Sequence, residues 1–286
     1  MADIMLGQHP LLKKEFIDKR VRGLIGHQFV ADQLFTASTV DALAIKYLQD
    51  ADKDSKDRQA YDGVPEVGEG STFQRIGLNE EEKTAMIKKY GLEAVLTYEM
   101  QKWGSDGVFE RAIRKLALNV KKMVDTMGYD VATNKYTIGN GIQGSTSGGW
   151  AANETNVINE LVDAKTAIAD FGYSADTAVV HPKVGATLLK NKGIRDALRV
   201  NNTDVALLRG YIGDFMGLSI IQDDNFKDGD VVVLQKKIIG DIADAEGLRT
   251  GTYNEEKNMR TVARATRFTQ AYVTDPKAIF LLKTVK

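Results

Sequence analysis

The most regular hydrophobic pattern in the chain predicts an amphipathic helix over residues 106–127. Its apolar residues recur at steps of three and four, which places them on one face of a helix. Ser105 or Asp106 can cap the start, and Gly128 suits the position just past the end. At about 1.5 Å per residue this helix is a rod of roughly 33 Å, long enough to span a domain. The predicted buried face consists of Phe109, Ala112, Ile113, Leu116, Val120, Met123, Val124 and Met127.

Alternation over residues 260–273 predicts a long strand with two semi-polar faces. Asp275 and Pro276 then turn the chain into a last strand over 278–282. One face of the long strand carries Val262, Arg264, Thr266, Phe268, Gln270 and Tyr272, and the other carries Thr261, Ala263, Ala265, Arg267, Thr269 and Ala271.

Helical and strand patterns alternate over residues 155–242, which favours a compact α/β lobe. A loop rich in glycine and serine, 139–149, precedes them. The predicted elements are a helix over 155–170 with Val157, Ile158, Leu161 and Ile168 buried, a strand over 177–180, a helix from Pro182 through Lys190, and strands over 218–221, 231–234 and 238–242.

The first third of the chain is more polar. Residues 1–30 are weakly periodic, with interspersed basic and acidic side chains, and are read as an arm or a solvated helix. Residues 29–35 and 42–48 are strand-like or short buried runs. Residues 49–72 have little to bury and should be exposed.

Two strand-like stretches, 72–76 and 83–90, predict an antiparallel flap with a charged tip. A lone hairpin in water is marginally stable, so this flap should lie on something else, such as a neighbouring subunit. Its charged residues are either solvated or dock on complementary charge of that neighbour. They are Glu80, Glu81, Glu82, Lys88 and Lys89.

Composition narrows the class of protein. The chain has 286 residues, of which 43% are apolar, so it can bury a sizeable core as one large domain or two intimate ones. The absence of cysteine excludes disulfides, Cys-ligated zinc, iron–sulfur clusters and a thiol nucleophile. A net charge of −1 argues against a protein that holds DNA by a strong overall positive field. Without an apolar leader or membrane-spanning run, we expect a soluble α+β protein made inside the cell.

Several motifs resemble catalytic or cofactor-binding sites, but each lacks features that such a site needs. Residues 139–144 spell G-x-G-x-x-G, but Ser and Gly follow where a dinucleotide site needs a helix start. Asp50, Asp52 and Asp54 mimic a calcium loop whose later ligand positions are missing. His181 lies at a strand-to-helix junction without an attached mechanism. We therefore expect no catalytic residues, no metal site and no cofactor.

The order of these elements resembles the major capsid proteins of tailed bacteriophages, which share the HK97-type fold. An arm, a long two-stranded loop, a long helix, an α/β lobe and a closing long strand follow one another in that order. The amino-acid sequences of several short segments are also similar to those of the family. These segments are 70–75, 83–90, 96–100, 178–182, 215–221 and 258–259, and the resemblance covers about residues 30–286.

The resemblance implies an α+β chain with an HK97-like capsid fold: N-terminal arm, extended β-hairpin loop, long spine helix, peripheral domain and α/β axial domain. The implied parts are an N-terminal arm (1–30), a peripheral domain (31–61, 97–130 and 251–286), an extended loop (62–96) that lies over an adjacent subunit, and an axial domain (131–250).

The resemblance also implies where copies of the chain meet. The candidate inter-subunit contacts are Phe73, Arg75, Glu80, Glu81, Glu82, Lys88, Lys89, Asn258, Arg264 and Arg267. Some family members cross-link a loop Lys to an Asn with help from a Glu. The matching positions here are Arg75, Asn258 and Ala265. Because a guanidinium stays protonated and is a poor nucleophile, we expect no autocatalytic cross-links.

The function that follows is an icosahedral shell of hexamers and pentamers around the phage genome. Expected partners are further copies of the chain, a portal protein, a separate scaffolding protein or none, a decoration protein, and double-stranded DNA held by confinement. The expected location is the virion capsid, after synthesis in the cytoplasm of a bacterial host. Two alternatives stay open: an encapsulin-like shell around a cargo enzyme, and a small α/β enzyme that uses the 139–149 loop and His181.

Overall fold

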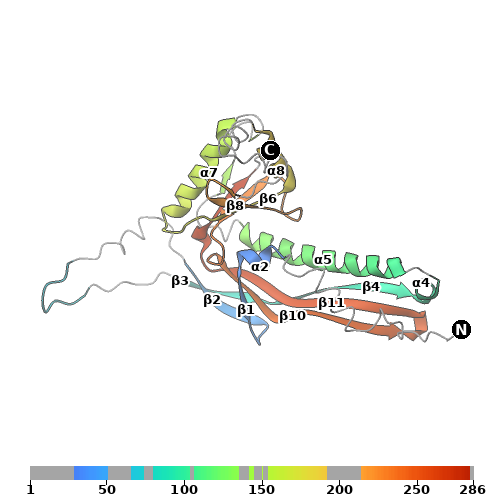
Figure 1. The fold of residues 1–286 in the computed structure, drawn as a ribbon. Helices are drawn as coiled ribbons and strands as arrows, with labels where there is room; N and C mark the ends of the chain where they lie inside the picture. The colour runs from blue at the N-terminus through green and yellow to red at the C-terminus, as the bar shows by residue number, and fades with distance from the viewer. Residues whose placement is uncertain are drawn as a thin grey trace.

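The computed structural model describes residues 29–50, 66–73, 80–103, 106–134, 142–144, 150, 154–191 and 214–283. The expected N-terminal arm lies almost wholly outside the described residues, as do Arg75, Ser105, Asp52, Asp54 and most of the glycine-rich loop. The described residues form three parts: a long platform, a lobe that stands on one end of it, and a hairpin that projects from the same end (Figure 1).

The platform is a helix lying on a four-stranded sheet. Strand order in the sheet is β1–β10–β11–β4, with β1 and β10 parallel and the other pairs antiparallel. The helix, α5, covers one face of the sheet (Figure 1). The bounds are Asp106–Ala132 for α5, Thr36–Thr39 for β1, Lys88–Thr97 for β4, Gly240–Glu255 for β10 and Arg260–Val273 for β11. The predicted strand over 260–273 is confirmed.

The predicted amphipathic pattern explains why α5 lies on β11. Ile113, Leu116 and Val124 are buried against the sheet, as the steps of three and four require. The facing side of β11 carries Ala263 and Ala265, whose small side chains let the helix approach closely. The helix and the long strand therefore bury each other.

The predicted end of the helix at Gly128 is wrong, because α5 continues to Ala132. A short helix, α2 (Ala31–Leu34), packs across this turn of α5. A Cβ on Gly128 would lie 2.8 Å from the Ala31 Cβ, closer than real contacts allow. Gly128 thus serves a close approach between two helices, and not the termination of one. Of the two expectations for residues 29–35, the strand is wrong, because 31–34 are helical, and the short buried run is confirmed.

The lobe is built on a six-stranded sheet of order β5–β12–β9–β6–β8–β7. Helices α7 and α8 cover one face, and the other face joins the core beneath α5. The strands are Ile142–Gly144 (β5), Thr177–Val180 (β6), Asp214–Phe215 (β7), Leu218–Gln222 (β8), Asp230–Leu234 (β9) and Ile279–Lys283 (β12), and the helices are Glu154–Ala169 (α7) and Pro182–Lys190 (α8). Because both faces are covered, β6 and β9 are buried throughout, and all their residues except the first of each, Thr177 and Asp230, are apolar.

Several lobe predictions need correction. Ile142–Gly144, inside the predicted glycine-rich loop, pairs with β12 as an edge strand. Ile158, predicted to be buried, is 38% exposed on α7. Of the predicted short strand over 238–242, residues 238 and 239 lie in a turn and residues 240–242 are the start of β10, which belongs to the platform sheet. Conversely, the last strand of the chain, β12, lies in the lobe between β5 and β9.

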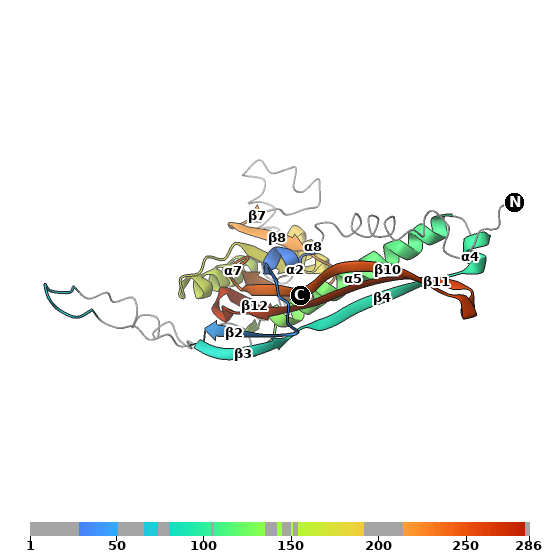
Figure 2. The same ribbon diagram turned by 90° about the horizontal axis from the view of Figure 1, so that it is seen from below.

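The projecting hairpin pairs different strands from those predicted. β2 (Ala44–Asp50) pairs antiparallel with β3 (Glu80–Met86), from Ala44↔Met86 to Asp50↔Glu80. Thr72 and Phe73 are not in a strand, and 74–79 lie outside the described residues. The predicted strand over 83–90 is split at Ile87, whose amide donates to the Leu43 carbonyl and whose side chain is buried. This break passes the chain from the hairpin to β4 of the platform (Figure 2).

Candidate assembly surfaces

The base of the hairpin is anchored on the platform. The rings of Tyr47 and Tyr272 lie 4.6 Å apart, within a small cluster around Ile87. Gln49 donates from Nε2 to the Val273 carbonyl at 2.9 Å. Asp50, the first residue of the calcium-like motif, forms an ion pair with the buried Lys277 at 2.9 Å. The proximal hairpin therefore has a fixed direction relative to the platform.

The rest of the hairpin is exposed and acidic. Over 44–50, 66–73 and 80–86 the chain has six acidic residues and two lysines. Lys46 pairs with Glu82 at 2.8 Å, and Lys83 lies 3.7 Å from Glu81. Apolar side chains are displayed beside these charges: Leu48, Met86 and Phe73 are 57%, 61% and 81% exposed. Residues 66–73 lie farther out, beyond the hairpin and away from the platform (Figure 1).

The solvent side of α5 is basic. Arg111, Arg114, Lys115 and Lys122 are exposed on it, and no acidic residue occurs between 111 and 124. Arg111 lies three and four positions before Arg114 and Lys115, and Lys122 follows Lys115 by seven positions, so all four side chains lie along one side of the helix. We call these four residues the α5 basic stripe.

The outer face of the platform sheet, opposite α5, is a mixed-charge surface. Arg264 lies 4.0 Å from Glu93, and Arg249 lies 2.9 Å from Glu246. Lys89 stands over the ring of Phe268 at 5.6 Å. A shallow hollow of about 360 Å³ lies between these groups. Lys89 and Arg264, both candidates for inter-subunit contact, thus share one face.

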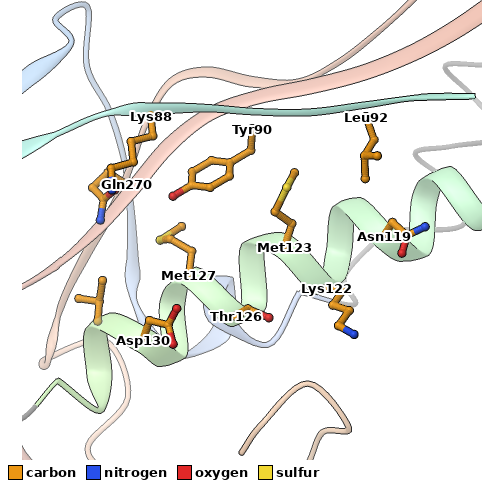
Figure 3. Close-up of a pocket in the computed structure, with 11 residues that line it drawn as sticks. Lys88, Tyr90, Leu92, Asn119, Lys122, Met123, Thr126, Met127, Asp130 and Gln270 are labelled. Carbon is orange, nitrogen blue, oxygen red and sulfur yellow. The ribbon is translucent and has the colours of Figure 1, made fainter.

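A second hollow, of about 500 Å³, lies between β4 and α5. Tyr90 of β4 and Met123 and Met127 of α5 point into it, and Lys88 and Asp130 lie at one end (Figure 3). Lys88 is therefore on the helix side of β4 and Lys89 on the outer side, as the period of a strand requires.

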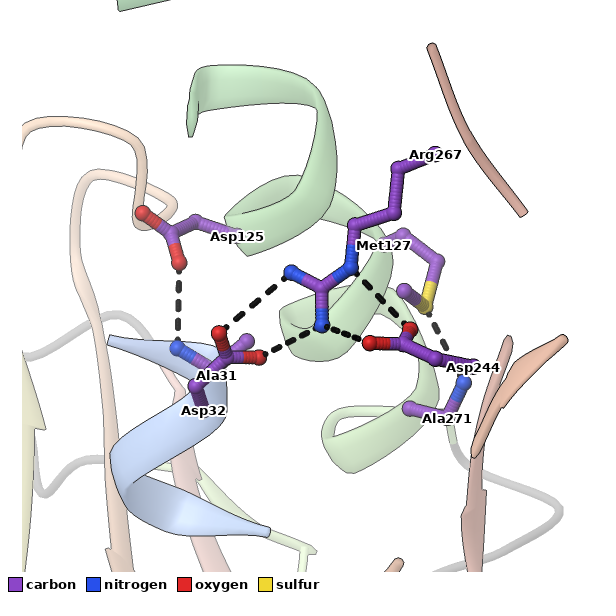
Figure 4. A network of polar contacts seen from close by, with 7 residues as sticks. All are labelled: Ala31, Asp32, Asp125, Met127, Asp244, Arg267 and Ala271. Carbon is purple, nitrogen blue, oxygen red and sulfur yellow. Dashed lines mark hydrogen bonds and ion pairs between the residues drawn. The ribbon is translucent and has the colours of Figure 1, made fainter. Parts of the chain in front are cut away.

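Arg267 is not a surface residue, contrary to its choice as a candidate contact. Its side chain is 6% exposed and lies between two carboxylates (Figure 4). It donates to Asp244 at 2.9 and 3.0 Å and to Asp32 at 3.0 Å. Because a buried guanidinium needs such partners, Arg267 ties α2 to the platform sheet. The alternating pattern of β11 indicates this burial, because Arg267 lies on the same face of the strand as Ala263 and Ala265.

Asn258 lies at the far tip of the platform, in the 3₁₀ turn Glu256–Asn258 between β10 and β11. Its Nδ2 donates to Glu255 at 3.1 Å. Hydrogen bonds from Arg260 and then from Asn258 hold the pKa of Glu255 below its ordinary value. Ala265, at the position that matches the family's Glu, is fully buried beneath α5. Near the same tip, the half-buried Tyr98 of α4 (Tyr98–Lys102) meets the exposed ring of Trp103, the residue after the helix.

His181 has a structural role at the start of α8. It is the N-cap of α8, and its Nδ1 accepts a hydrogen bond from the Lys183 amide at 3.1 Å. This agrees with the interpretation of His181 as a junction residue. Among the residues that the structure describes, no group of three or more acidic or histidine side chains is placed to hold a metal ion. None of the described helices is long and apolar enough to cross a membrane.

Comparisons with known proteins agree with this architecture. A phage-related protein from Bordetella bronchiseptica is 12% identical and matches 95% of this chain and 96% of its own, with a TM-score of 0.64. The capsid of cyanophage P-SCSP1u matches at 10% identity over 89% and 88%, with a TM-score of 0.67. The SrpI encapsulin of Synechococcus elongatus PCC 7942 matches at 11% identity over 92% and 89%, with a TM-score of 0.55. The fold is the HK97-type shell fold.

The sequence itself assigns the family. No curated protein sequence matches the chain. The family model described as phage capsid protein matches residues 80–282, which is most of the chain and includes α5, the platform strands β4, β10 and β11, and nearly all of the lobe. This protein therefore belongs to the phage capsid protein family.

Proposed function

We propose that this chain is the major capsid protein of a tailed phage, and that its copies assemble as hexamers and pentamers into an icosahedral shell around the genome. The observation that carries the assembly step is the projecting hairpin. A two-stranded ribbon is marginally stable alone, and this one displays Leu48 and Met86 to solvent, while Phe73 is exposed in the segment beyond it. Contact with a second copy completes the burial that a single copy leaves unfinished.

Charge supports a particular counter-surface for the hairpin. The strands β2 and β3 and residues 66–73 together carry a net charge of −4, from six acidic residues and two lysines. The α5 basic stripe presents four cations with no acidic residue among them. We place the hairpin of one copy across the stripe of the next, with Glu80, Glu81 and Glu82 facing it. Each exposed pair contributes little, but the contact is repeated throughout a closed shell.

The sheet topology supports revised domain limits. We assign α5 and the four-stranded sheet to the peripheral domain, and the six-stranded sheet with α7 and α8 to the axial domain. On this assignment β10 from Gly240 onward is peripheral and β12 is axial. The extended loop comprises β2, β3 and the residues between them. Candidate contacts on exposed surfaces are then Phe73, Glu80, Glu81, Glu82, Lys88, Lys89, Asn258 and Arg264.

Further parts of the proposal follow from the family. A portal protein and a scaffolding or decoration protein are expected partners, double-stranded DNA is held by confinement, and the protein resides in the virion capsid after synthesis in a bacterial host. The family match indicates a structural protein, and we propose that the chain has no enzymatic activity. The N-cap role of His181 supports this.

The second candidate is an encapsulin-like compartment, which the likeness to the SrpI encapsulin favours. The two candidates differ in cargo. A genome shell purified from its producing cells should show the absorbance ratio of nucleic acid, whereas a compartment should carry a co-purifying protein. The family match favours the genome shell.

Electron microscopy and light scattering of the expressed chain test the assembly. Hexamers, pentamers, tubes or closed shells are the expected result, and a monomer at every concentration and salt, with or without a scaffold, would overturn the proposal. A charge exchange tests the counter-surface. Glu80→Lys with Glu81→Lys, or Arg114→Glu with Lys115→Glu, should each reduce assembly, and the four changes together should restore it. Failure to restore it would reject the stripe as the partner surface.

A denaturing gel of assembled shells tests the cross-link prediction separately. The expected result is a single band at the mass of the chain. An SDS-resistant ladder would overturn the prediction that Arg75 and Ala265 cannot support an isopeptide bond.

A further inference from the structure

A buried carboxylate lies where the lobe, the platform and α2 meet. Asp125 of α5 is fully buried. Its Oδ1 accepts a hydrogen bond from the Ala31 amide at 3.0 Å, at the start of α2 (Figure 4). Its Oδ2 is also buried and has no hydrogen-bond partner among the described residues. A carboxylate removed from water with one unsatisfied oxygen is costly in its charged form.

A second buried carboxylate faces the same junction from the lobe. Asp223 follows β8, and its Oδ2 accepts a hydrogen bond from the hydroxyl of Tyr129. Tyr129 lies one turn after Asp125 on α5, and its ring meets that of Phe226 edge-on at 5.0 Å. The hydrogen bond between Tyr129 and Asp223 therefore joins the lobe to α5 beside the apolar core that the lobe and the platform share, and Asp125 lies one turn earlier on α5.

The remaining charges around Asp125 do not neutralise it. Lys121, one turn earlier on α5, attracts it, while Asp223 in the turn after β8 repels it. Asp224, next to Asp223, also acts on Tyr129. On α2, the carboxylate of Asp32 is engaged by Arg267, which Asp244 of β10 shares. The guanidinium of Arg267 is thus already paired with the carboxylates of Asp32 and Asp244.

These surroundings bring the titration of Asp125 into the neutral range. The pKa of Asp125 is raised from its ordinary 3.8 to about 7: burial is the largest cause and the charge of Asp223 adds to it, while the backbone amides of Ala31 and Val30 and the charge of Lys121 lower the pKa. The protonated form removes both the buried charge and the repulsion between the two acids. A small change in pH below 7 therefore changes how strongly the three parts hold together.

We propose that Asp125, Asp223 and Tyr129 form a protonation-sensitive latch that holds α2 and the lobe turn 223–226 against α5. The latch is tightest when Asp125 is protonated and weakens as Asp125 ionises. Opening the latch frees α2 from α5. The inference rests on the junction within one copy and holds whether or not the chain assembles.

The sign and size of the effect follow from linkage. If opening returns Asp125 to its ordinary pKa, the closed junction binds an extra proton between pH 4 and pH 7. Opening should then increase about tenfold per pH unit across that range and level off above pH 7. The corresponding part of the free energy of unfolding is lost as the pH rises, and is regained on acidification from neutral pH.

Hydrogen exchange of the unassembled full chain measures the latch. We expect the protection factors of the amides of 31–35, corrected for intrinsic exchange, to fall about a hundredfold from pH 5 to pH 7 and then to level off. Asp125→Asn should make protection independent of pH over this range, because its amide keeps an acceptor for Ala31 without a charge. Asp130→Asn, an exposed acid on the same helix, should leave the wild-type profile unchanged.

A second variant keeps the test decisive where Asp125→Asn alters folding. Asp223→Asn removes the neighbouring charge but retains an acceptor for Tyr129. The pH above which the protection factors of residues 31–35 stop falling should therefore be lower than in the wild type. Equal pH profiles in the wild type and in Asp223→Asn would overturn the proposal, as would a wild-type profile that is flat from pH 5 to pH 7. Shell assembly by electron microscopy is scored on the same samples, so failure of the latch and failure of the proposed function are seen separately.

Discussion

Strands of alternating pattern build both the layer between α5 and β11 and the projecting hairpin. The two regions differ in how their side chains are buried and paired. In the layer, Arg267 is enclosed by Asp32 and Asp244, and Ala263 and Ala265 lie beneath the helix. On the hairpin, acidic side chains and Leu48 face solvent. Burial is thus complete within one copy in the first region and left for a neighbour in the second.

The difference predicts two classes of variant. Changes in the layer should unfold the isolated chain, because its contacts exist before assembly. Changes on the hairpin should leave the chain folded and reduce assembly, because the missing contacts belong to a second copy. The variants below test this division, from the largest expected effect on stability to the smallest.

Gly240→Ala should have the largest effect. Gly240 opens β10 with φ +155, and a Cβ there would lie 2.1 Å from the Tyr272 carbonyl oxygen. We expect a loss of about 3 kcal/mol or more in the free energy of unfolding, measured by chemical denaturation. Gly251→Ala in the same strand is the matched control, because its Cβ meets nothing within 4 Å. Equal losses in the two variants would contradict the steric explanation.

Arg267→Met should come next. The change leaves the carboxylates of Asp32 and Asp244 without their cation, at 36% and 22% side-chain exposure. Removal of one partner of a buried pair costs about 3–5 kcal/mol, and this partial exposure reduces the expected loss to about 2–3 kcal/mol. Arg264→Met, three residues earlier on the exposed face, should cost less than about 1 kcal/mol. If both variants lose the same stability, the two faces of β11 do not differ as we describe.

Gly128→Ala should have an intermediate effect. The new methyl group meets the Ala31 Cβ at 2.8 Å and must displace α2, against a gain of about 1 kcal/mol in helix propensity. A net loss of about 1–2 kcal/mol is expected in thermal or chemical unfolding. A stabilised variant would show that α2 moves freely, which would also weaken the latch proposal.

Phe73→Ser should have the smallest effect on the isolated chain. The ring is 81% exposed, so the free energy of unfolding should change by less than about 0.5 kcal/mol. The yield of shells by electron microscopy should fall, because an apolar contact with the neighbour is lost. Unchanged assembly would remove Phe73 from the contact surface, and an unfolded chain would contradict the division between the two regions.

The elements with a strong period could be predicted from the sequence. The helix that became α5, the strand over 260–273 and the lobe elements at 177–190 all follow from local periodicity and caps. His181 could be interpreted correctly because an N-cap is a local feature, decided by the amide two residues later.

Pairing and packing between distant segments could not be predicted. Thr72 lies nearer in sequence to β3, but β2 provides the partner strand, and Gly128 is explained only by Ala31. The Asp125 latch was also missed, since its two acids are separated by almost a hundred positions and each is unremarkable in its own segment.

The sequence by itself determined which residues form the long helix and the long strand, and the ordered set of elements identified the family. Those properties depend on neighbours within a few positions, where the period of a helix or a strand sorts side chains onto faces. Only the tertiary structure decided that Arg267 is buried, that β12 returns to the lobe and that Asp125 is buried against the start of α2. These depend on which surfaces the fold brings together, and burial then fixes the charge and the packing that each residue tolerates.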